Sequence, residues 1–404
     1  MKKFNPNILL FTFAIVFILV GVWGNCFEQL RLKAADMMTE LERGNRQSIL
    51  AFKDSVEDVS TEELRYHDAM MDVNSVKENL LGTRLIEKDD LTVVKSERGS
   101  LTAPSKKIPQ SDIDQIAANI AELERVTEAN GGKFLYCAAP AKQLLEEEPA
   151  NAENSFKANY DALIKALAEA DIPYLDFAES LHYYDDSRSY PFYYTDHHWT
   201  VRTAFEAANS ICRTLNRKYG FAVDENCANI ENYNVQTYEN WFLGSFGKKV
   251  GTYFTWRGAD DFELITPKFQ TNLTEEQPFK NQVRSGSFEE SVLYMENMEK
   301  GHYRFNSYAT YSGGDFRLQI MKNNLNPEGK KILMIRDSFA CGVAPFLALQ
   351  TKELHLCDMR DTEFLVGDKL NAEAYIREIK PDYVIVLYSG VNALSESHGQ
   401  YNFF

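Results

Sequence analysis

The alternation of amphipathic helices with short apolar strands constrains the fold of this 404-residue chain more than any other feature. Apolar residues at helical spacing predict helices over residues 111–128, 155–170, 200–219, 342–352 and 371–380. Short apolar runs predict strands over residues 133–140, 174–178, 330–338, 352–358 and 382–390. Strands that alternate with helices form a mainly parallel sheet with helices on its faces. We therefore predict an α/β fold whose functional loops leave the carboxyl ends of the strands.

Residues 221–328 interrupt this alternation. They are rich in Asn, Tyr, Thr and Gly, and they contain short alternating runs at 251–256 and 262–266. We interpret them as a β-rich insertion within a divided α/β domain. The segment before that domain is helical in pattern and becomes loop-like from about residue 81. The predicted parts are an anchor at 1–25, a juxtamembrane helical stalk at 26–104, the α/β domain at 105–220 and 329–404, and the insertion at 221–328.

An apolar segment near the N-terminus suggests attachment to a membrane. Ile8 to Gly24 is a run of 17 residues without a charge, and Lys2 and Lys3 precede it. At ~1.5 Å per residue such a helix can just cross the hydrocarbon core of a bilayer. We predict an uncleaved signal anchor, with the chain single-pass in the cell membrane and its bulk outside the cytoplasm. A cleaved signal peptide is the alternative.

Charge and cysteine content exclude several classes of function. The net charge of −16 argues against nucleic acid as a partner, because phosphate binding needs a basic face. None of the six cysteines forms a C-x-x-C pair, so a zinc knuckle or thioredoxin-like motif is absent. Cys227 and Cys357 could pair with each other. We expect no cofactor.

Two motifs contain residue types suited to acyl transfer. Asp196-His197-His198-Trp199 is one, and Ser338 lies in the other, at a predicted strand-to-helix turn. A serine at such a turn is exposed above the sheet, but it needs a base to take its proton. A histidine is that base when a carboxylate holds its tautomer, and Asp196 lies two residues from His198.

Each motif also has a simpler interpretation. Adjacent histidines beside Asp196 are a plausible metal site, but no third spaced His or Cys partner is evident, so we predict no metal. Asp337 would simply cap the helix that follows it.

The first motif resembles the signature of the DHHW proteins, which belong with the SGNH-hydrolase-like O-acetyltransferases, the group of the alginate acetylation proteins. The similarity extends over roughly residues 70–395 and includes 140–142, 242–248 and 336–339. It implies an SGNH-like parallel sheet flanked by helices. It also implies Ser338 as the nucleophile, His198 as the base and Asp196 as the group that orients His198. His197 would support these residues without reacting.

The resemblance also suggests oxyanion donors. Ordinary SGNH hydrolases use the serine N–H, a glycine N–H and an asparagine side chain. The Ser338 N–H and Asn392, in Gly390-Val391-Asn392, match that pattern, and Gly313 and Gly314 are the alternative donors. This chain departs from the pattern by Arg336 before Asp-Ser and by Ala393 after Asn392.

Aromatic residues crowd between positions 183 and 199, and sugar rings stack on such side chains. We predict substrate contacts for Tyr194, Trp199 and Lys248. A packed core and a solvated charge are the alternatives.

The resemblance implies a membrane-anchored, extracytoplasmic O-acetyltransferase that modifies a cell-surface or exported polysaccharide through an acyl-serine intermediate. Acetyl-CoA is absent outside the cell, so the implied partner is a membrane-bound O-acyltransferase family protein that passes acetyl groups across. A carbohydrate acetylesterase with the same triad and a non-catalytic envelope scaffold are the alternatives.

Overall fold

The computed structural model describes residues 67–88, 91–146, 149, 152–180, 190–299, 303–362, 365–389 and 399–404, together with Arg31, Ala34 and Met38. The chain divides into two units, Met1–Leu81 and Gly82–Phe404. The described helix of the first unit is α3 (His67–Leu80). The predicted anchor at residues 8–24 lies outside the described residues. None of the described helices combines the length and apolar character that a membrane span requires.

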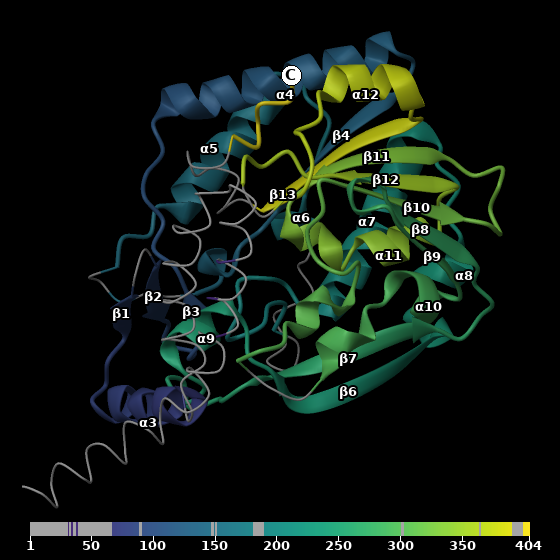
Figure 1. The fold of residues 1–404 in the computed structure, drawn as a ribbon. Coiled ribbons are helices and arrows are strands. Elements are labelled where there is room, and N and C mark those ends of the chain that lie inside the picture. The colour runs from purple at the N-terminus through teal and green to yellow at the C-terminus, as the bar shows by residue number, and fades with distance from the viewer. Residues whose placement is uncertain are drawn as a thin grey trace, which may run out of the picture. The chain divides into compact units, whose positions relative to one another are not determined.

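A large mixed sheet forms the centre of the second unit (Figure 1). Its eight strands lie in the order β5-β4-β13-β11-β12-β10-β8-β9. The strands are β4 (Lys133–Ala139), β5 (Tyr174–Asp176), β8 (Leu273–Gln277), β9 (Gln282–Gly286), β10 (Leu318–Asn323), β11 (Lys331–Arg336), β12 (Glu353–Cys357) and β13 (Tyr383–Ser389). From β5 to β12 every pairing is parallel, which confirms the predicted α/β core.

The described helices of this unit are α4 (Gln110–Ala129), α5 (Phe156–Glu169), α6 (Phe177–Ser180), α7 (Val201–Tyr219), α8 (Glu225–Ala228), α9 (Ser245–Val250), α10 (Phe288–Val292), α11 (Ala344–Ala348) and α12 (Ala372–Ile379). Helices cover both faces of the sheet because its central strands are apolar on both sides. On β11, Leu333 and Ile335 pack with α4, α5 and α12, whereas Ile332 and Met334 pack with α7 and α11. Figure 1 shows α4 and α12 on one side of the sheet and α7 and α11 on the other.

The predicted β-rich insertion is only partly a separate feature. Its strands β6 (Tyr233–Phe242) and β7 (Asp260–Pro267) form a two-stranded sheet of their own. However, β8, β9 and β10 extend the central sheet, because β10 pairs antiparallel with both β12 and β8. The predicted strand at 251–256 is wrong, since these residues form turns.

A small antiparallel sheet lies within the segment that we predicted as a stalk. Its strands are β1 (Leu85–Lys88), β2 (Leu91–Lys95) and β3 (Leu101–Thr102). Val93 and Leu101 of this sheet pack with Phe246 and Val250 of α9 in a small apolar cluster. The sheet therefore forms one support for α9, which lies beside the candidate site described below.

The five described cysteines are buried and unpaired, including Cys227 and Cys357. Burial raises the pKa of each thiol, that of Cys357 to about 12.

Candidate active site

The turn after β11 places Ser338 at the carboxyl edge of the parallel strands. Asp337 ends the strand, and its carboxylate accepts hydrogen bonds from the backbone N–H groups of Phe339 (3.0 Å) and Ser389 (2.7 Å). The first bond caps a short 3₁₀ turn over Ser338–Cys341, as the sequence indicated for Asp337. The second ties this turn to the end of β13. Ser338 is thereby held half-buried on a rigid junction between two strands.

The loop with the DHHW motif is closed by its own backbone. Tyr193 N–H donates to the His198 carbonyl (3.1 Å), and Thr200 N–H donates to the Pro191 carbonyl (2.9 Å). Thr200 then caps α7, because its side chain accepts from the Thr203 N–H (3.2 Å). The loop geometry is therefore fixed up to the first residue of α7.

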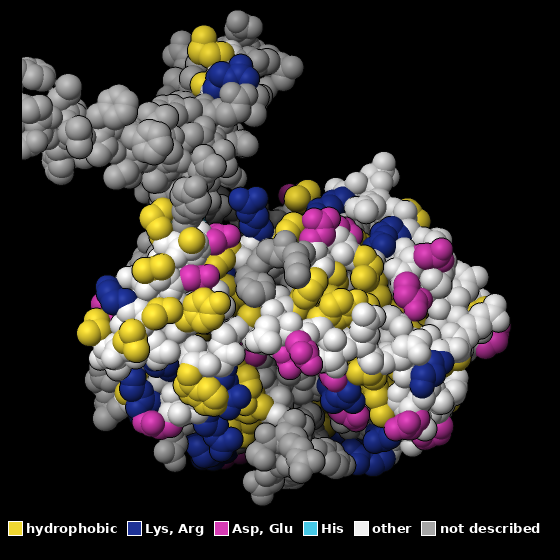
Figure 2. Space-filling view, turned by 90° about the horizontal axis from the view of Figure 1, so that it is seen from below, with side chains coloured by type: hydrophobic (Ala, Val, Ile, Leu, Met, Phe, Trp, Pro, Cys, Tyr) yellow, Lys and Arg dark blue, Asp and Glu magenta, His cyan; other side chains and the backbone are white. Residues whose placement is uncertain are grey.

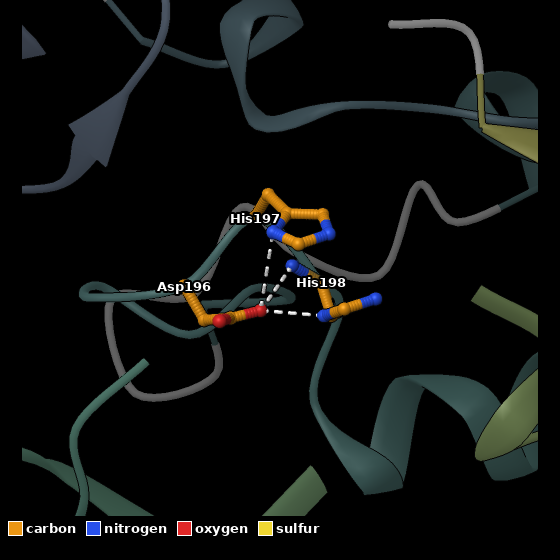
Figure 3. Close-up of side chains that lie close together, drawn as sticks. All are labelled: Asp196, His197 and His198. Atoms are coloured by element: carbon orange, nitrogen blue, oxygen red, sulfur yellow. Dashed lines mark hydrogen bonds and ion pairs between the residues drawn. The ribbon is translucent and has the colours of Figure 1, made fainter. Parts of the chain in front are cut away.

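Asp196, His198 and Ser338 form one continuous hydrogen-bonded chain. His198 Nε2 lies 2.7 Å from Ser338 Oγ, and His198 Nδ1 lies 2.5 Å from Asp196 Oδ1. Asp196 also accepts from the backbone N–H groups of His198 (2.9 Å) and Ser245 (2.6 Å). Figure 3 shows the Asp196 carboxylate beside the two histidines, with one of its oxygens in contact with both. The three residues thus have the connections that a serine nucleophile, a base and an orienting carboxylate require.

The carboxylate of Asp196 is held in its charged form. Burial opposes ionisation. It is outweighed by the nearby imidazoles of His197 and His198 and by the hydrogen bonds that Asp196 accepts from His198 and Ser245. The pKa of Asp196 consequently lies well below its ordinary value. A charged Asp196 is able to stabilise a protonated His198 during a reaction.

Aromatic rings hold the His198 imidazole in place. It stacks on Tyr308 at a centroid separation of 4.0 Å, with Phe339 at 5.1 Å. The His197 side chain contacts Ser245, with its Nδ1 3.0 Å from Ser245 Oγ. Desolvation and the nearby His198 lower the pKa of His197, although 32% of its side chain stays exposed. A neutral His197 fits the supporting position that the resemblance implied.

The metal interpretation rests on the same residues. Asp196, His197 and His198 bring ligand atoms within 4.8 Å of one another. Two of the relevant atoms are already engaged, since His198 Nδ1 bonds Asp196 and His198 Nε2 bonds Ser338. A serine triad therefore accounts for the arrangement better than a cation site does.

The segment before α9 clamps the triad loop through two glycines. A Cβ on Gly244 would lie 2.1 Å from the Asp196 Cβ, so only glycine fits there. Gly244 N–H donates to Thr195 Oγ1 (2.8 Å), and Gly247 N–H donates to the Thr195 carbonyl (2.9 Å). The sequence analysis matched this segment to the family without assigning it a role. The two glycines three residues apart were the available signal.

Two buried charged residues that sequence reasoning missed also position this loop. Asp260 accepts from the backbone N–H groups of Tyr194 (2.6 Å) and Thr195 (2.8 Å). Lys142 Nζ donates to the carbonyl groups of Tyr193 (2.8 Å) and Tyr194 (3.2 Å). Burial raises the pKa of Asp260 to about 6 and lowers the pKa of Lys142 to about 8. Both side chains thus satisfy backbone groups of this loop, whose Tyr194 carbonyl also accepts from the Leu101 N–H of β3 (2.7 Å).

A buried ion-pair network lies behind the nucleophile. Arg336 is fully buried, pairs with Asp315 and donates from Nη2 to the Gly314 carbonyl (3.0 Å). Asp315 also accepts from Arg360 Nη2 at 2.6 Å. Burial opposes ionisation of Asp315, but Arg336 and Arg360 outweigh it and lower the pKa of Asp315 to about 2. The arginine that departs from the ordinary SGNH pattern therefore fixes the position of Gly314.

The segment with the predicted oxyanion glycines contacts the nucleophile turn through Ser312 and Gly314. Ser312, Gly313 and Gly314 all have positive φ, at 63°, 74° and 106°. Ser312 Oγ donates to the Cys341 carbonyl (2.9 Å), and the Cys341 thiol lies 3.4 Å from the Gly314 carbonyl. The other candidate, Asn392, lies outside the described residues.

The three residues predicted as substrate contacts lie in different environments. The prediction for Trp199 is wrong: its side chain is 0% exposed, and its Nε1 donates to the Phe339 carbonyl (3.0 Å). Trp199 instead links the DHHW loop to the nucleophile turn. Lys248 Nζ donates to the Phe305 carbonyl (2.7 Å) and so supports a neighbouring loop. Tyr194 remains half-exposed beside a cavity.

The fold and the site together resemble those of SGNH hydrolase-like proteins, and comparisons with known proteins agree. Residues 100–240 match the family described as SGNH hydrolase-like domain, acetyltransferase AlgX. PatB1 of Bacillus cereus, solved with a sulfonyl adduct, has a similar structure with a TM-score of 0.62 at 19% identity, covering 79% of this chain and 99% of that one. A DHHW family protein from Eubacterium siraeum has a TM-score of 0.56 at 17% identity, covering 79% and 96%. No curated protein sequence matches the chain. The resemblance stated from the motifs is confirmed.

Proposed function

We propose that this protein is an O-acetyltransferase that acetylates a polysaccharide outside the cytoplasm, with Ser338, His198 and Asp196 as its catalytic residues. The observation that carries the proposal is the unbroken chain from Asp196 through His198 to Ser338, with contacts of 2.5 and 2.7 Å. The match to an acetyltransferase family over residues 100–240 supports acetyl as the group transferred.

The first half of the reaction forms an acyl-enzyme. Ser338 Oγ attacks the carbonyl carbon of an acetyl ester or thioester, and His198 Nε2 takes the serine proton. Asp196 stabilises the imidazolium and keeps Nδ1 protonated. When the tetrahedral intermediate collapses, the bond to the leaving alcohol or thiol breaks, and His198 returns the proton to that group. Acetyl-Ser338 remains.

The second half transfers the acetyl group to a sugar. A sugar hydroxyl takes the place of the leaving group, His198 accepts its proton, and its oxygen attacks the acetyl carbonyl. Collapse releases the sugar acetate, and the proton returns to Ser338 Oγ. Transfer over hydrolysis then depends on whether a sugar or a water molecule reaches His198 first.

Backbone N–H groups are our proposed stabilisers of the developing oxyanion. Ser338 N–H begins the 3₁₀ turn, and the segment with Gly313 and Gly314 contacts the same turn through Ser312 and Gly314. Arg336 has a positioning role here, because it holds the Gly314 carbonyl. Removing one donor of such a hole typically slows a reaction by about 10²–10³-fold. Asn392 stays a predicted additional donor.

We further propose that the N-terminal apolar run anchors the chain in the cell membrane, with the triad outside the cytoplasm. Its acetyl donor would then be a membrane-bound O-acyltransferase family protein. Acetyl-CoA is not present outside the cytoplasm, so the acetyl group must cross the membrane by another route, which such a partner would supply.

The test uses the full chain in detergent with a chromogenic acetate ester as donor and an oligosaccharide as acceptor. We expect acetylated sugar, and one acetyl group on Ser338 by intact mass. Ser338→Ala and His198→Ala should each reduce the rate by on the order of 10⁴-fold. Ser285→Ala, at an exposed serine of β9, is the matched control and should leave the rate unchanged.

The products separate the alternatives. Free acetate without acetylated sugar would identify an esterase with the same triad. Ester turnover that persists in Ser338→Ala would remove this serine from the mechanism, and no turnover by the folded wild type would favour a scaffold.

A further inference from the structure

A cavity of about 950 Å³ lies beside the DHHW loop and is separate from the reacting atoms. Tyr194 and Thr200 of that loop form one wall, Arg202 and Glu206 of α7 form a second, and the β6–β7 sheet forms a third. Ser338 and His198 are not among its lining residues. Its size is in the range of ligand-binding sites, and it shares the loop that carries the triad.

One rim of the cavity is a column of stacked planar groups. Tyr190 and Tyr194 stack at 4.6 Å with an interplanar angle of 22°. The Arg257 guanidinium lies 3.8 Å from the Tyr194 ring centroid and 4.6 Å from that of Trp256. Trp256 ends the column and is 71% exposed. The column therefore offers a large aromatic face to solvent at one end.

Arg257 is pre-oriented but only partly used. Its Nε donates to the Arg98 carbonyl (3.1 Å), and its terminal nitrogens have no acceptor within hydrogen-bond distance among the described residues. Two aromatic rings fix its plane, so little side-chain entropy would be lost when it binds a ligand. A fixed guanidinium edge suits two adjacent acceptor oxygens.

The charge around the cavity distinguishes between possible ligands. Arg202 pairs with Glu263 through two contacts of 2.7 and 2.9 Å, so these two charges offset each other. Asp261 and Glu206 also line the cavity, and their negative charges offset the positive charge of Arg257. Glu206 accepts no hydrogen bond from the described residues and is half-buried. Carboxylates of this kind accept hydrogen bonds from hydroxyl groups and repel anions.

One face of the molecule also carries side chains of mixed character. On the face seen from below in Figure 1, hydrophobic side chains lie among basic and acidic ones, without a field of one sign (Figure 2). Together with the net charge of −16, this disfavours an anionic polymer.

We propose that this cavity and the Trp256 face form a binding subsite for a neutral, hydroxyl-rich oligosaccharide segment. A sugar ring would stack its C–H face on Trp256, and Arg257 would donate to its oxygens. Asp261 and Glu206 would accept hydrogen bonds from further hydroxyl groups. The inference rests on the proposed function, in which such a segment belongs to the acceptor polysaccharide, and it names the neutral class of that acceptor.

Binding is measured without any chemistry, so that the two proposals fail separately. The full chain with Ser338→Ala, in detergent, is titrated with neutral hexasaccharides of glucose, mannose and N-acetylglucosamine and with a uronate hexasaccharide. Saturation-transfer NMR reports the sugar protons in contact, and isothermal titration reports the dissociation constant.

We expect at least one neutral hexasaccharide to bind more tightly than the uronate. Trp256→Ala should weaken that binding by about tenfold. Arg257→Lys keeps the charge but loses the planar fork, and it should weaken binding by about fivefold. Phe279→Ala, at a partly exposed aromatic residue between β8 and β9, is the control and should leave the dissociation constant unchanged.

Three results would overturn the subsite. They are no binding of any neutral hexasaccharide, preferential binding of the uronate, or an affinity of the Trp256 and Arg257 variants equal to that of the parent Ser338→Ala chain. If acetyl transfer is absent while neutral binding persists and responds to these variants, the proposed function fails and the subsite stands.

Discussion

Gly244→Ala should disable the triad without removing any of its members. The added Cβ would lie 2.1 Å from the Asp196 Cβ, 2.6 Å from its Cα and 2.7 Å from its backbone nitrogen. Ordinary contacts of a Cβ begin near 3.4 Å. Asp196 must therefore move by about 1 Å or more, and displacements of that size in a reacting constellation cost about 10²-fold in rate. These three atoms of Asp196 do not move when its side chain rotates, so no change of rotamer relieves the clash.

The assay is kcat/KM for a chromogenic acetate ester, with folding followed by circular dichroism. We expect a loss of about 10²-fold or more, together with destabilisation of about 1–3 kcal/mol from overpacking. Gly329→Ala is the matched control, because its Cβ would meet only the Asn326 side chain in the turn between β10 and β11. A folded Gly244→Ala protein with activity within about threefold of the wild type would refute the claim that this contact positions Asp196.

Two further substitutions test the buried supports of the loop. Burial lowers the pKa of Lys142 from 10.5 to about 8, so this side chain binds fewer protons in the folded than in the unfolded state between these pH values, and its contribution to the free energy of unfolding should rise with pH there. Between pH 8 and 10.5 the slope of the free energy of unfolding against pH should therefore be more positive in the wild type than in Lys142→Met, by at most about 1.4 kcal/mol per pH unit, as denaturant titrations at several pH values will measure; equal slopes in both proteins would contradict the assignment. Trp199→Phe removes the N–H that donates to the Phe339 carbonyl at 3.0 Å. That carbonyl keeps a second donor in the Tyr308 hydroxyl, so the free energy of unfolding should fall by about 1 kcal/mol for the lost hydrogen bond. KM for the acetate ester should not change, and a raised KM with unchanged stability would restore Trp199 as a substrate contact.

Local patterns in the sequence predicted much of the α/β core. The predicted strand over 133–140 corresponds to β4, and the predicted helix over 200–219 corresponds to α7, which ends at a left-handed Gly220. Such elements are encoded by neighbouring residues, through apolar spacing, caps and glycine stops. The motif residues Asp196, His198 and Ser338 were also named from sequence, and the structure brings them together.

Long-range pairing and burial were beyond the reach of the same reasoning. The residues of β8 and β10 do not by themselves indicate that these strands extend the central sheet, because antiparallel register depends on partners far along the chain. Lys142 was missed because lysines are seldom fully buried, and only the loop carbonyls that it meets explain its position. Trp199 was misassigned because an aromatic residue beside a catalytic motif has the same sequence signal whether it faces a ligand or the core.

The state of the thiols affects how the nucleophile is identified chemically. All five described cysteines are buried, and burial keeps each of them in the protonated form, which reacts poorly with electrophiles. A serine-directed sulfonyl or phosphonyl reagent therefore meets no competing thiolate among them. Among the described residues, covalent labelling then reports on the activated hydroxyl and not on a thiol.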